Sequence, residues 1–129
     1  KSILNNNKVS LSFFWEKMER QIIIKGRAFK TTDDISDKYF NSRPLGSKIG
    51  ALVSSNQSSV IPSRSFLEDK FKKIKKQFEN TNISRPINWG GFIVKPIEYE
   101  FWQGRENRLH DRIRYNKKDN KWIIERLSP

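Results

Sequence analysis

Two stretches near the start of the chain alternate in the way that β-strands do. From Val9 to Trp15 the apolar residues fall at every second position, which is typical of a strand with one buried face. The run from Gln21 to Thr31 is rich in β-branched residues and places two small residues, Gly26 and Ala28, on one face. The pattern predicts that the two strands pair as a hairpin across residues 16–19.

Helical spacing replaces this alternation after the second strand. Thr32 can cap the N-terminus of a helix, and the two aspartates that follow place negative charge in its first turn, where the helix dipole favours it. An apolar stripe that includes Ile35 and Phe40 continues until Pro44, where a helix would end. A short second helix is expected over residues 47–53.

The next segment predicts a longer amphipathic helix. Ser65 and Glu68 have the spacing of a capping box. Apolar residues then recur at helical spacing, namely Leu67, Phe71, Ile74 and Phe78. The lysines between them lie largely on other faces and are interpreted as a solvated outer surface without a site role.

The last forty residues return to strand patterns. Trp89–Phe92 opens strands over residues 93–94 and 97–102, which Pro96 interrupts, indicating a bulge or an edge position. A final hairpin is expected from Arg112–Tyr115, through a turn over residues 116–120, to a last strand over 122–124. The sequence therefore predicts one mostly β domain with helices inserted between strands, an α+β fold class.

The composition and the net charge limit the possible classes of binding partner but do not identify one. The 129 residues include no cysteine, which excludes disulfides and thiolate metal sites and fits a reducing, cytoplasmic compartment. The net charge of +12 indicates an anionic partner, which could be nucleic acid, an acidic surface or a small phosphorylated ligand. No apolar stretch is long enough to span a membrane. The opening on Lys1, without an initiator Met, is interpreted as a cut inside a longer protein.

Polar side chains before and after Pro44 form a first candidate anion site. Tyr39 and Arg43 lie four residues apart, so on a helix a phenol and a guanidinium could converge on one anion, and Ser47 adds a hydroxyl. The residues alone favour a plainer reading, in which Tyr39 packs in the core and Arg43 is solvated. The polar loop over residues 54–59 is either a linker or a source of donors for a phosphate.

The densest chemical cluster lies between the last two strand regions. It combines a tryptophan, several arginines and the only histidine within eleven positions: Trp102, Gln103, Arg105, Arg108, His110, Asp111 and Arg112. A planar anionic ligand would need such a set of an aromatic ring, guanidinium groups and an imidazole. A lone histidine in an arginine-rich turn can equally be structural, and the residues alone leave both readings open.

The segment over residues 100–112, EFWQGRENRLHDR, resembles the signature of the pyridoxamine 5'-phosphate oxidase family. Five further motifs occur in the family's order: Glu19–Gln21, Tyr39–Pro44 leading to Ser47, Gln57–Ser59, Trp89–Phe92 and Arg126–Pro129. The resemblance covers essentially the whole chain. It implies a flavin mononucleotide (FMN)-binding split β-barrel that dimerises, with residues from about 89 onward as the family's C-terminal dimerisation region.

The resemblance also implies a reaction and a set of site residues. An FMN-dependent oxidase would convert pyridoxamine or pyridoxine 5'-phosphate to pyridoxal 5'-phosphate, with dioxygen as acceptor and hydrogen peroxide as product, in a homodimer whose sites lie between subunits. No metal, membrane or nucleic acid would be involved. The implied FMN contacts are Gln21, Gln57, Ser58, Trp102 and Arg112. The implied substrate-phosphate residues are Tyr39, Arg43 and Ser47, and those against the pyridine ring are Arg108, Leu109 and His110.

Arg108 and His110 are the expected catalytic residues. Because the flavin carries the redox chemistry, the protein needs to orient the substrate and tune charge around it. Arg108 is a permanent cation, whereas His110 could be either an orienting hydrogen-bonder or a proton acceptor.

The chain departs from the family in lacking an N-terminal segment whose strands supply further FMN and phosphate contacts. We therefore expect the isolated chain to bind FMN weakly and to turn over poorly. The alternative function is a non-catalytic flavin-binding or dimerisation fragment on the same scaffold. A nucleic-acid-binding domain ranks last, because the basic residues are dispersed and no recognition motif accompanies them.

Overall fold

The computed structural model describes residues 2–79 and 81–129. They group into two compact units: the described residues up to 29 together with 92–129 form the sheet unit, and residues 30–91 form the helical unit. Each unit is described by itself. The elements in chain order are α1 (Ser2–Asn5), β1 (Lys8–Trp15), the 3-10 turn η1 (Glu16–Met18), β2 (Arg20–Lys30), α2 (Asp33–Ser42), α3 (Leu45–Val53), α4 (Arg64–Gln77), β3 (Phe92–Gln103), η2 (Glu106–Arg108), β4 (Asp111–Lys118) and β5 (Lys121–Leu127).

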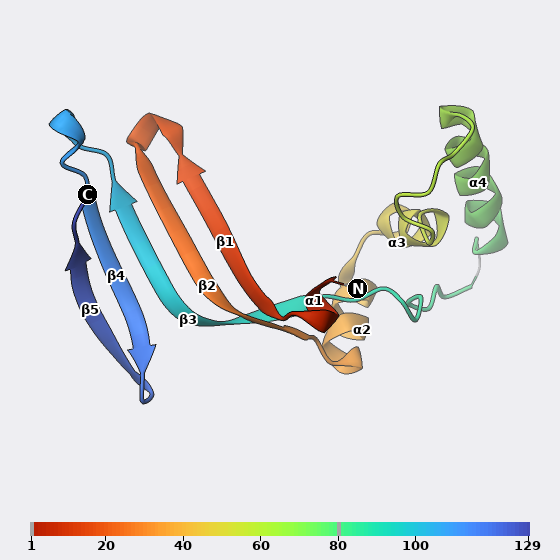
Figure 1. Ribbon diagram of the computed structural model, residues 1–129. Helices are drawn as coiled ribbons and strands as arrows, with labels where there is room; N and C mark the ends of the chain where they lie inside the picture. The colour runs from red at the N-terminus through yellow and green to blue at the C-terminus, as the bar shows by residue number, and fades with distance from the viewer. Residues whose placement is uncertain (1, 80) are drawn as a thin grey trace. The chain divides into compact units, whose positions relative to one another are not determined.

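The five strands form one sheet in the order β1-β2-β3-β4-β5, which is also their order along the chain (Figure 1). β1 and β2 are antiparallel, with Phe13 opposite Ile22. β3 and β4 are antiparallel with Trp102 opposite Arg112, and β5 pairs with the other side of β4. Helices α2 to α4 come between β2 and β3 in the sequence. The expected mostly β fold with inserted helices is confirmed.

The two expected hairpins are present, and the second has a tighter turn than expected. The first closes through η1 and Glu19, whose φ of 48° is left-handed. The second turns at Asp119 and Asn120, with φ of 48° and 62°, as a two-residue type I′ turn requires. The expected turn over 116–120 is wrong in extent, because residues 116–118 pair with residues 121–123 in the β4–β5 register.

Pro96 does not interrupt β3, contrary to the expectation of two separate strands. The strand is continuous from Phe92 to Gln103. Its register with β4 begins at Glu98, so Pro96 precedes the part of the strand that has a partner on that side. A residue without an N–H is tolerated at such an edge position. The edge interpretation of Pro96 therefore agrees with the structure, and the bulge is not needed.

The core of the helical unit lies among the three helices and the segment after them. Phe40, Ile49, Val53 and Ile83 are buried, and partly buried side chains pack around them: Ala51, Leu52, Leu67, Phe71, Ile74, Phe78 and Trp89. The apolar stripe expected on the helix over residues 64–77 is thus the face that packs inward. The stripe expected on α2 is only partly correct, because Phe40 is buried whereas Ile35 is 52% exposed.

The helix caps agree with the sequence at one helix and differ at another. The Thr32 hydroxyl accepts from the backbone N–H of Ile35 at 3.4 Å, as expected for the start of α2. Helix α4 begins earlier than its expected capping box, because Ser63 rather than Ser65 accepts from the backbone N–H of Phe66 at 3.2 Å. Ser65 lies inside the first turn, where its hydroxyl meets that of Ser63 at 2.8 Å.

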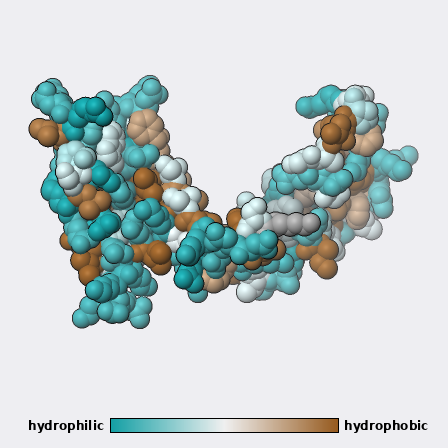
Figure 2. All heavy atoms as spheres, viewed as in Figure 1, coloured by the Kyte–Doolittle hydropathy of each residue, from teal (hydrophilic) through white to brown (hydrophobic). Residues whose placement is uncertain are grey.

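The sheet unit leaves large apolar side chains at its surface. Figure 2 shows hydrophobic groups of this unit interspersed with hydrophilic ones. On β1 the exposed apolar side chains are Leu11, Phe13, Phe14 and Trp15. The strand is present as expected, but the expected buried face is not, because only Val9 on β1 is partly covered by the described residues.

A glycine on β2 sets how closely β2 and β3 approach. A Cβ on Gly26 would clash with the carbonyl oxygen of Lys95 and would lie 3.0 Å from Pro96 Cα. Both are backbone atoms, which cannot move aside as the end of a side chain can. We predict that Gly26→Ala lowers the free energy of unfolding by about 1–3 kcal/mol, measured by urea denaturation.

Gly46→Ala is the matched control, because an added Cβ there meets no atom within 4 Å. A helical glycine replaced by alanine should leave the free energy of unfolding unchanged or raise it by up to about 1 kcal/mol. Equal stability of the Gly26→Ala variant and the wild type would contradict the close approach.

Candidate functional site

The loop between β3 and β4 is tied to the turn between β1 and β2. The Gln103 side-chain amide donates to the carbonyl of Met18 at 3.1 Å, and its oxygen accepts from Arg20 Nε at 2.7 Å. The backbone N–H of Gly104 donates to the Glu19 carbonyl at 2.7 Å. A Cβ on Gly104 would lie 2.7 Å from Glu19 Cβ, so only glycine permits this approach. These contacts hold the start of the loop that carries Arg105 to His110.

His110 is fixed by two contacts within this loop and its strand. Its Nδ1 accepts a hydrogen bond from the backbone N–H of Arg105 at 3.1 Å. Its ring lies 4.9 Å from the Trp102 ring, centre to centre. A nitrogen that accepts from an N–H carries no proton, so neutral His110 has its proton on Nε2. The imidazole therefore offers a donor, and not an acceptor, at Nε2.

Arg108 and Leu109 lie in the same loop and remain exposed. Arg108 has a φ of 61° and follows Asn107, which is also left-handed. Leu109 is 68% exposed. Both side chains are thus open to a ligand, which is consistent with the expected contact with a substrate ring.

Arg105 and Asp111, by contrast, form ion pairs with other side chains of the protein. Arg105 Nε donates to Asp111 Oδ2 at 2.8 Å, and Arg126 pairs with the other carboxylate oxygen. The hydrogen bond from Arg105, followed by that from Arg126, lowers the pKa of Asp111 below its ordinary value. Within the expected cluster, Arg105 therefore forms an ion pair that stabilises the loop. Arg108 is exposed.

Arg112 is half-buried opposite Trp102 in the β3–β4 register. Its Nε donates to Glu100 at 2.8 Å and its Nη1 to the Ser128 carbonyl at 2.9 Å. The hydrogen bond to Glu100 raises the pKa of Arg112 above its ordinary value. A guanidinium has five N–H donors, and these two contacts leave the others for an anionic ligand.

A hollow of about 480 Å³ lies in the sheet unit beside these residues. Gln21 and Trp102, both expected FMN contacts, line it together with Trp15, Phe101 and Gln103. Gln21 Nε2 also donates to Ser12 Oγ at 3.2 Å. The remaining expected FMN contact of this unit, Arg112, is on the strand next to Trp102 and does not line the hollow.

The lining fits a flavin by its chemistry. Aromatic and aliphatic side chains provide most of the surface, and the Gln21 amide and the charged groups of Arg20, Arg105 and Asp111 supply polar groups in the lining. Arg112 adds a cation beside Trp102.

In the helical unit, Trp89 brings together two of the three expected phosphate residues. The ring of Tyr39 stacks on that of Trp89 at 5.9 Å, and the guanidinium of Arg43 lies 5.1 Å from the Trp89 ring centre. Arg43 is the C-cap of α2 and has extended backbone, so the shared indole, and not helical spacing, joins the pair. Tyr39 is exposed rather than packed in the core, contrary to the plainer sequence reading.

One nitrogen of Arg43 is buried without a partner. Among the described residues, Nη1 of Arg43 is the one buried side-chain nitrogen or oxygen that lacks a hydrogen bond. A buried donor without an acceptor is costly, and a bound anion would satisfy it. Ser47, the third expected phosphate residue, is half-buried on α3 and its backbone N–H donates to Pro44 at 2.9 Å.

The polar loop after α3 holds the last two expected FMN contacts. Ser58 has a left-handed φ of 67°. Gln57 lines a hollow of about 220 Å³ together with Ser54, Ser55 and Asn88. The expectation of a polar loop over 54–59 is confirmed, since no helix or strand is found there.

Two contributors were missed as site residues by sequence reasoning. Trp89 was noted only as part of a motif, and Gln103 only as a member of a cluster. Their roles depend on contacts across long sequence separations, 46 residues from Arg43 to Trp89 and 85 from Met18 to Gln103. A tryptophan after a turn-rich segment and before two glycines is a weak signal for such a platform.

Two further findings concern the described residues as a set. No group of three or more histidine, cysteine, aspartate or glutamate side chains within residues 2–79 and 81–129 is arranged to hold a metal ion. None of the helices in the same ranges has the length and apolar character needed to cross a membrane.

Two protein families match successive parts of the sequence. Residues 1–78 match the family described as pyridoxamine 5'-phosphate oxidase. Residues 89–129 match the family described as pyridoxine 5'-phosphate oxidase C-terminal dimerisation region.

Curated relatives carry the name pyridoxine/pyridoxamine 5'-phosphate oxidase. One from Flavobacterium johnsoniae is 61% identical over 129 residues, covering 99% of this chain and 60% of the relative. One from Leptospira biflexa is 51% identical over 129 residues, covering 100% of this chain and 60% of the relative. The chain thus spans about 60% of the length of the curated relatives it matches.

Two solved structures resemble the fold. PhzG from Burkholderia lata 383, in complex with tetrahydrophenazine-1-carboxylic acid, matches with a TM-score of 0.83 and 27% identity, covering 96% of this chain and 60% of that chain. A pyridoxamine 5'-phosphate oxidase-related, FMN-binding protein from Nostoc punctiforme matches with a TM-score of 0.67 and 11% identity, covering 98% and 66%. Together with the family match, they confirm the expected FMN-binding split-barrel fold.

The backbone contact to His110 generates a prediction about its tautomer. Because Nδ1 accepts from Arg105, neutral His110 should carry its proton on Nε2. Two-dimensional ¹H–¹⁵N correlation spectra of the neutral imidazole should show an unprotonated Nδ1 and a protonated Nε2. A protonated Nδ1 would contradict the loop geometry, and His110→Gln would identify the signals.

Proposed function

Because the chain belongs to the pyridoxamine 5'-phosphate oxidase family, we propose that it forms the catalytic part of an FMN-dependent oxidase. The substrate would be pyridoxamine or pyridoxine 5'-phosphate and the product pyridoxal 5'-phosphate. Dioxygen would be reduced to hydrogen peroxide. With the amine substrate, water would supply the aldehyde oxygen and the nitrogen would leave as ammonia. The family match and the FMN-binding structural neighbour support FMN as the cofactor, as the sequence led us to expect.

The observation that carries this proposal is the unsatisfied guanidinium in the helical unit. Arg43 lies against Trp89 beside Tyr39, and its buried Nη1 lacks an acceptor among the described residues. A phosphate monoester has oxygens that can accept from a guanidinium and from a phenol at once. This arrangement fits the phosphate that both proposed substrates share, and Ser47 would add a third donor.

When bound, FMN would supply the two-electron oxidation chemistry at C4' of the substrate, with dioxygen as the final acceptor. The residues of this chain would bind and orient. Gln21 and Trp102 would contact the ring system from the lined hollow, and Arg112 would provide a cation beside them. Gln57 and Ser58 would contribute from the polar loop of the helical unit.

Arg108, Leu109 and His110 would lie against the pyridine ring. The contact of Nδ1 with Arg105 favours one of the two roles left open for His110. A neutral imidazole with its proton on Nε2 can donate to a ring substituent, whereas it has no free lone pair with which to take a proton. We therefore assign His110 an orienting role, with Arg108 as the adjacent permanent cation.

We also propose that the protein acts as a homodimer in the cytoplasm. The family description of residues 89–129 as a dimerisation region supports the dimer. This region carries an aromatic cluster in which Trp122 lies 5.3 Å from Tyr99 and Phe101 lies 5.5 Å from Tyr115. Phe101 and Trp122 of this cluster are exposed, and aromatic residues are enriched at protein interfaces.

The relatives do not favour the non-catalytic alternative, because they are named as oxidases. PhzG was solved with a different ligand, tetrahydrophenazine-1-carboxylic acid, so the fold accommodates more than one substrate class. The proposed phosphate ligands Tyr39, Arg43 and Ser47 favour a phosphorylated substrate over a ligand such as tetrahydrophenazine-1-carboxylic acid, which has no phosphate.

Peroxide release tests the proposed function. The purified chain is titrated with FMN by visible absorbance, and pyridoxamine 5'-phosphate is then added with a peroxide-coupled dye. We expect weak flavin binding and slow peroxide release that depends on the substrate. Arg108→Ala and His110→Ala should each lower the rate by about tenfold or more, because the substrate is no longer oriented.

Arg64→Ala is the control, because this side chain is exposed on α4 and pairs only with Glu68 among the contacts found. It should leave the rate unchanged. Bound flavin without any substrate-dependent peroxide would contradict the oxidase and favour the non-catalytic alternative. Tight stoichiometric FMN binding with rapid turnover would instead contradict the expectation of weak binding.

A further inference from the structure

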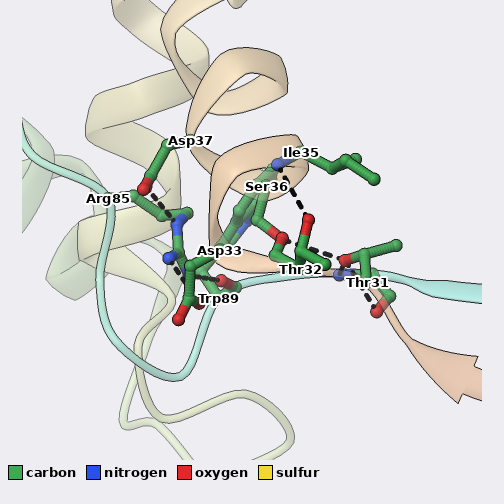
Figure 3. Close-up of polar contacts among 9 residues, drawn as sticks. Thr31, Thr32, Asp33, Ile35, Ser36, Asp37, Arg85 and Trp89 are labelled. Carbon is green, nitrogen blue, oxygen red and sulfur yellow. Dashed lines mark hydrogen bonds and ion pairs between the residues drawn. The ribbon is translucent and has the colours of Figure 1, made fainter.

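The guanidinium of Arg85, in the helical unit, donates three hydrogen bonds. Its Nε donates to Asp37 Oδ1 at 2.6 Å, its Nη2 to Asp33 Oδ1 at 2.9 Å, and its Nη1 to the carbonyl oxygen of Trp89 at 2.5 Å. Figure 3 shows the guanidinium between the two aspartates, with Trp89 beside it. The Arg85 side chain is only 9% exposed.

These contacts connect segments that are far apart in the sequence. Asp33 and Asp37 lie one turn apart on α2, and Arg85 follows Asp37 by 48 residues. The hydrogen bond to Asp37 is the largest cause that raises the pKa of Arg85 above its ordinary value. Only a guanidinium can satisfy two carboxylates and a carbonyl from one planar group. Arg85 therefore fixes the segment before β3 against α2.

Trp89 connects this anchor to the candidate phosphate site. Its carbonyl is held by Arg85, while its indole stacks on Tyr39 at 5.9 Å and lies under Arg43 at 5.1 Å. Phe40, which is fully buried, meets the same indole edge-on at 5.1 Å. The position of the indole thus determines where the Tyr39 phenol and the Arg43 guanidinium lie.

We infer that Arg85 is a positioning residue for phosphate binding, acting through Trp89 on Tyr39 and Arg43. This inference rests on the proposed function, which supplies the phosphate. Loss of the guanidinium leaves the Trp89 carbonyl and two aspartates without their shared donor. The indole then loses its fixed position, and the two phosphate ligands lose their common support. Recognition of the phosphate should weaken, whereas recognition of the vitamer ring should not.

Calorimetric binding of two ligands to the purified chain tests the inference. Pyridoxamine 5'-phosphate and pyridoxamine differ only in the phosphate, so the ratio of their affinities isolates its contribution. We expect Arg85→Gln to lower the affinity for the phosphorylated ligand by about tenfold or more and to leave that for pyridoxamine within about twofold. Asp37→Asn, which keeps two of the three contacts, should show a smaller loss in the same direction.

Arg64→Gln is the matched control, because it removes an arginine that pairs with a carboxylate on an exposed surface. It should bind both ligands as the wild type does. Circular dichroism and urea denaturation measure the folded fraction of each variant, and affinities refer to folded protein. An unchanged ratio of affinities in both Arg85→Gln and Asp37→Asn, or an equal loss for both ligands, would overturn the inference.

A ligand-free readout separates this inference from the proposed function. The Arg43 Hε and Tyr39 ring protons lie close to the Trp89 ring, so their NMR shifts report its position. Arg85→Gln should move these signals, and Arg64→Gln should not. If the wild type shows no preference for the phosphorylated ligand, the proposed function fails. Unmoved Arg43 and Tyr39 signals in Arg85→Gln would then contradict the positioning as well.

Discussion

The packing of Trp89 is the contact on which the helical unit and its candidate site both depend. The indole meets Phe40, which belongs to the buried core, in a T-shaped pair, and it also stacks on Tyr39 and lies under Arg43. Its backbone carbonyl is held by a guanidinium that also ties two aspartates of α2. The core packing and the proposed anion site are therefore coupled through one side chain. A cation held over an aromatic face is favourable, yet it leaves the guanidinium edge free for a ligand.

In the sheet unit, a glutamine side chain and backbone hydrogen bonds hold the candidate site residues in place. The loop that carries Arg108 and His110 has little regular structure, yet its start is bonded to the β1–β2 turn through Gln103 and Gly104. The His110 imidazole is then oriented by a backbone donor of the same loop. Residues that bind a substrate ring need fixed directions, and a loop supplies them only when its backbone is held in this way.

The sequence predicted elements better than it predicted contacts. Alternation and helical spacing located β1, β2, α2 and α4, because these patterns depend only on which residues face a core. They failed at Ser63 and at residues 116–118, where a local hydrogen bond and strand pairing decide the boundary. The resemblance to a family supplied the candidate site residues. Neither source indicated Trp89 as a platform or Arg85 as its anchor, because both roles arise from contacts between segments more than forty residues apart.

The central proposal is that Arg43 binds the phosphate of the substrate. The most direct measurement is a ³¹P NMR titration of pyridoxal 5'-phosphate with the wild-type chain and with Arg43→Gln, both checked for folding by circular dichroism. The account predicts a phosphorus resonance that shifts and broadens with the wild type and stays near its free position with the variant. The same shift with both proteins would show that the phosphate binds elsewhere and would contradict the account.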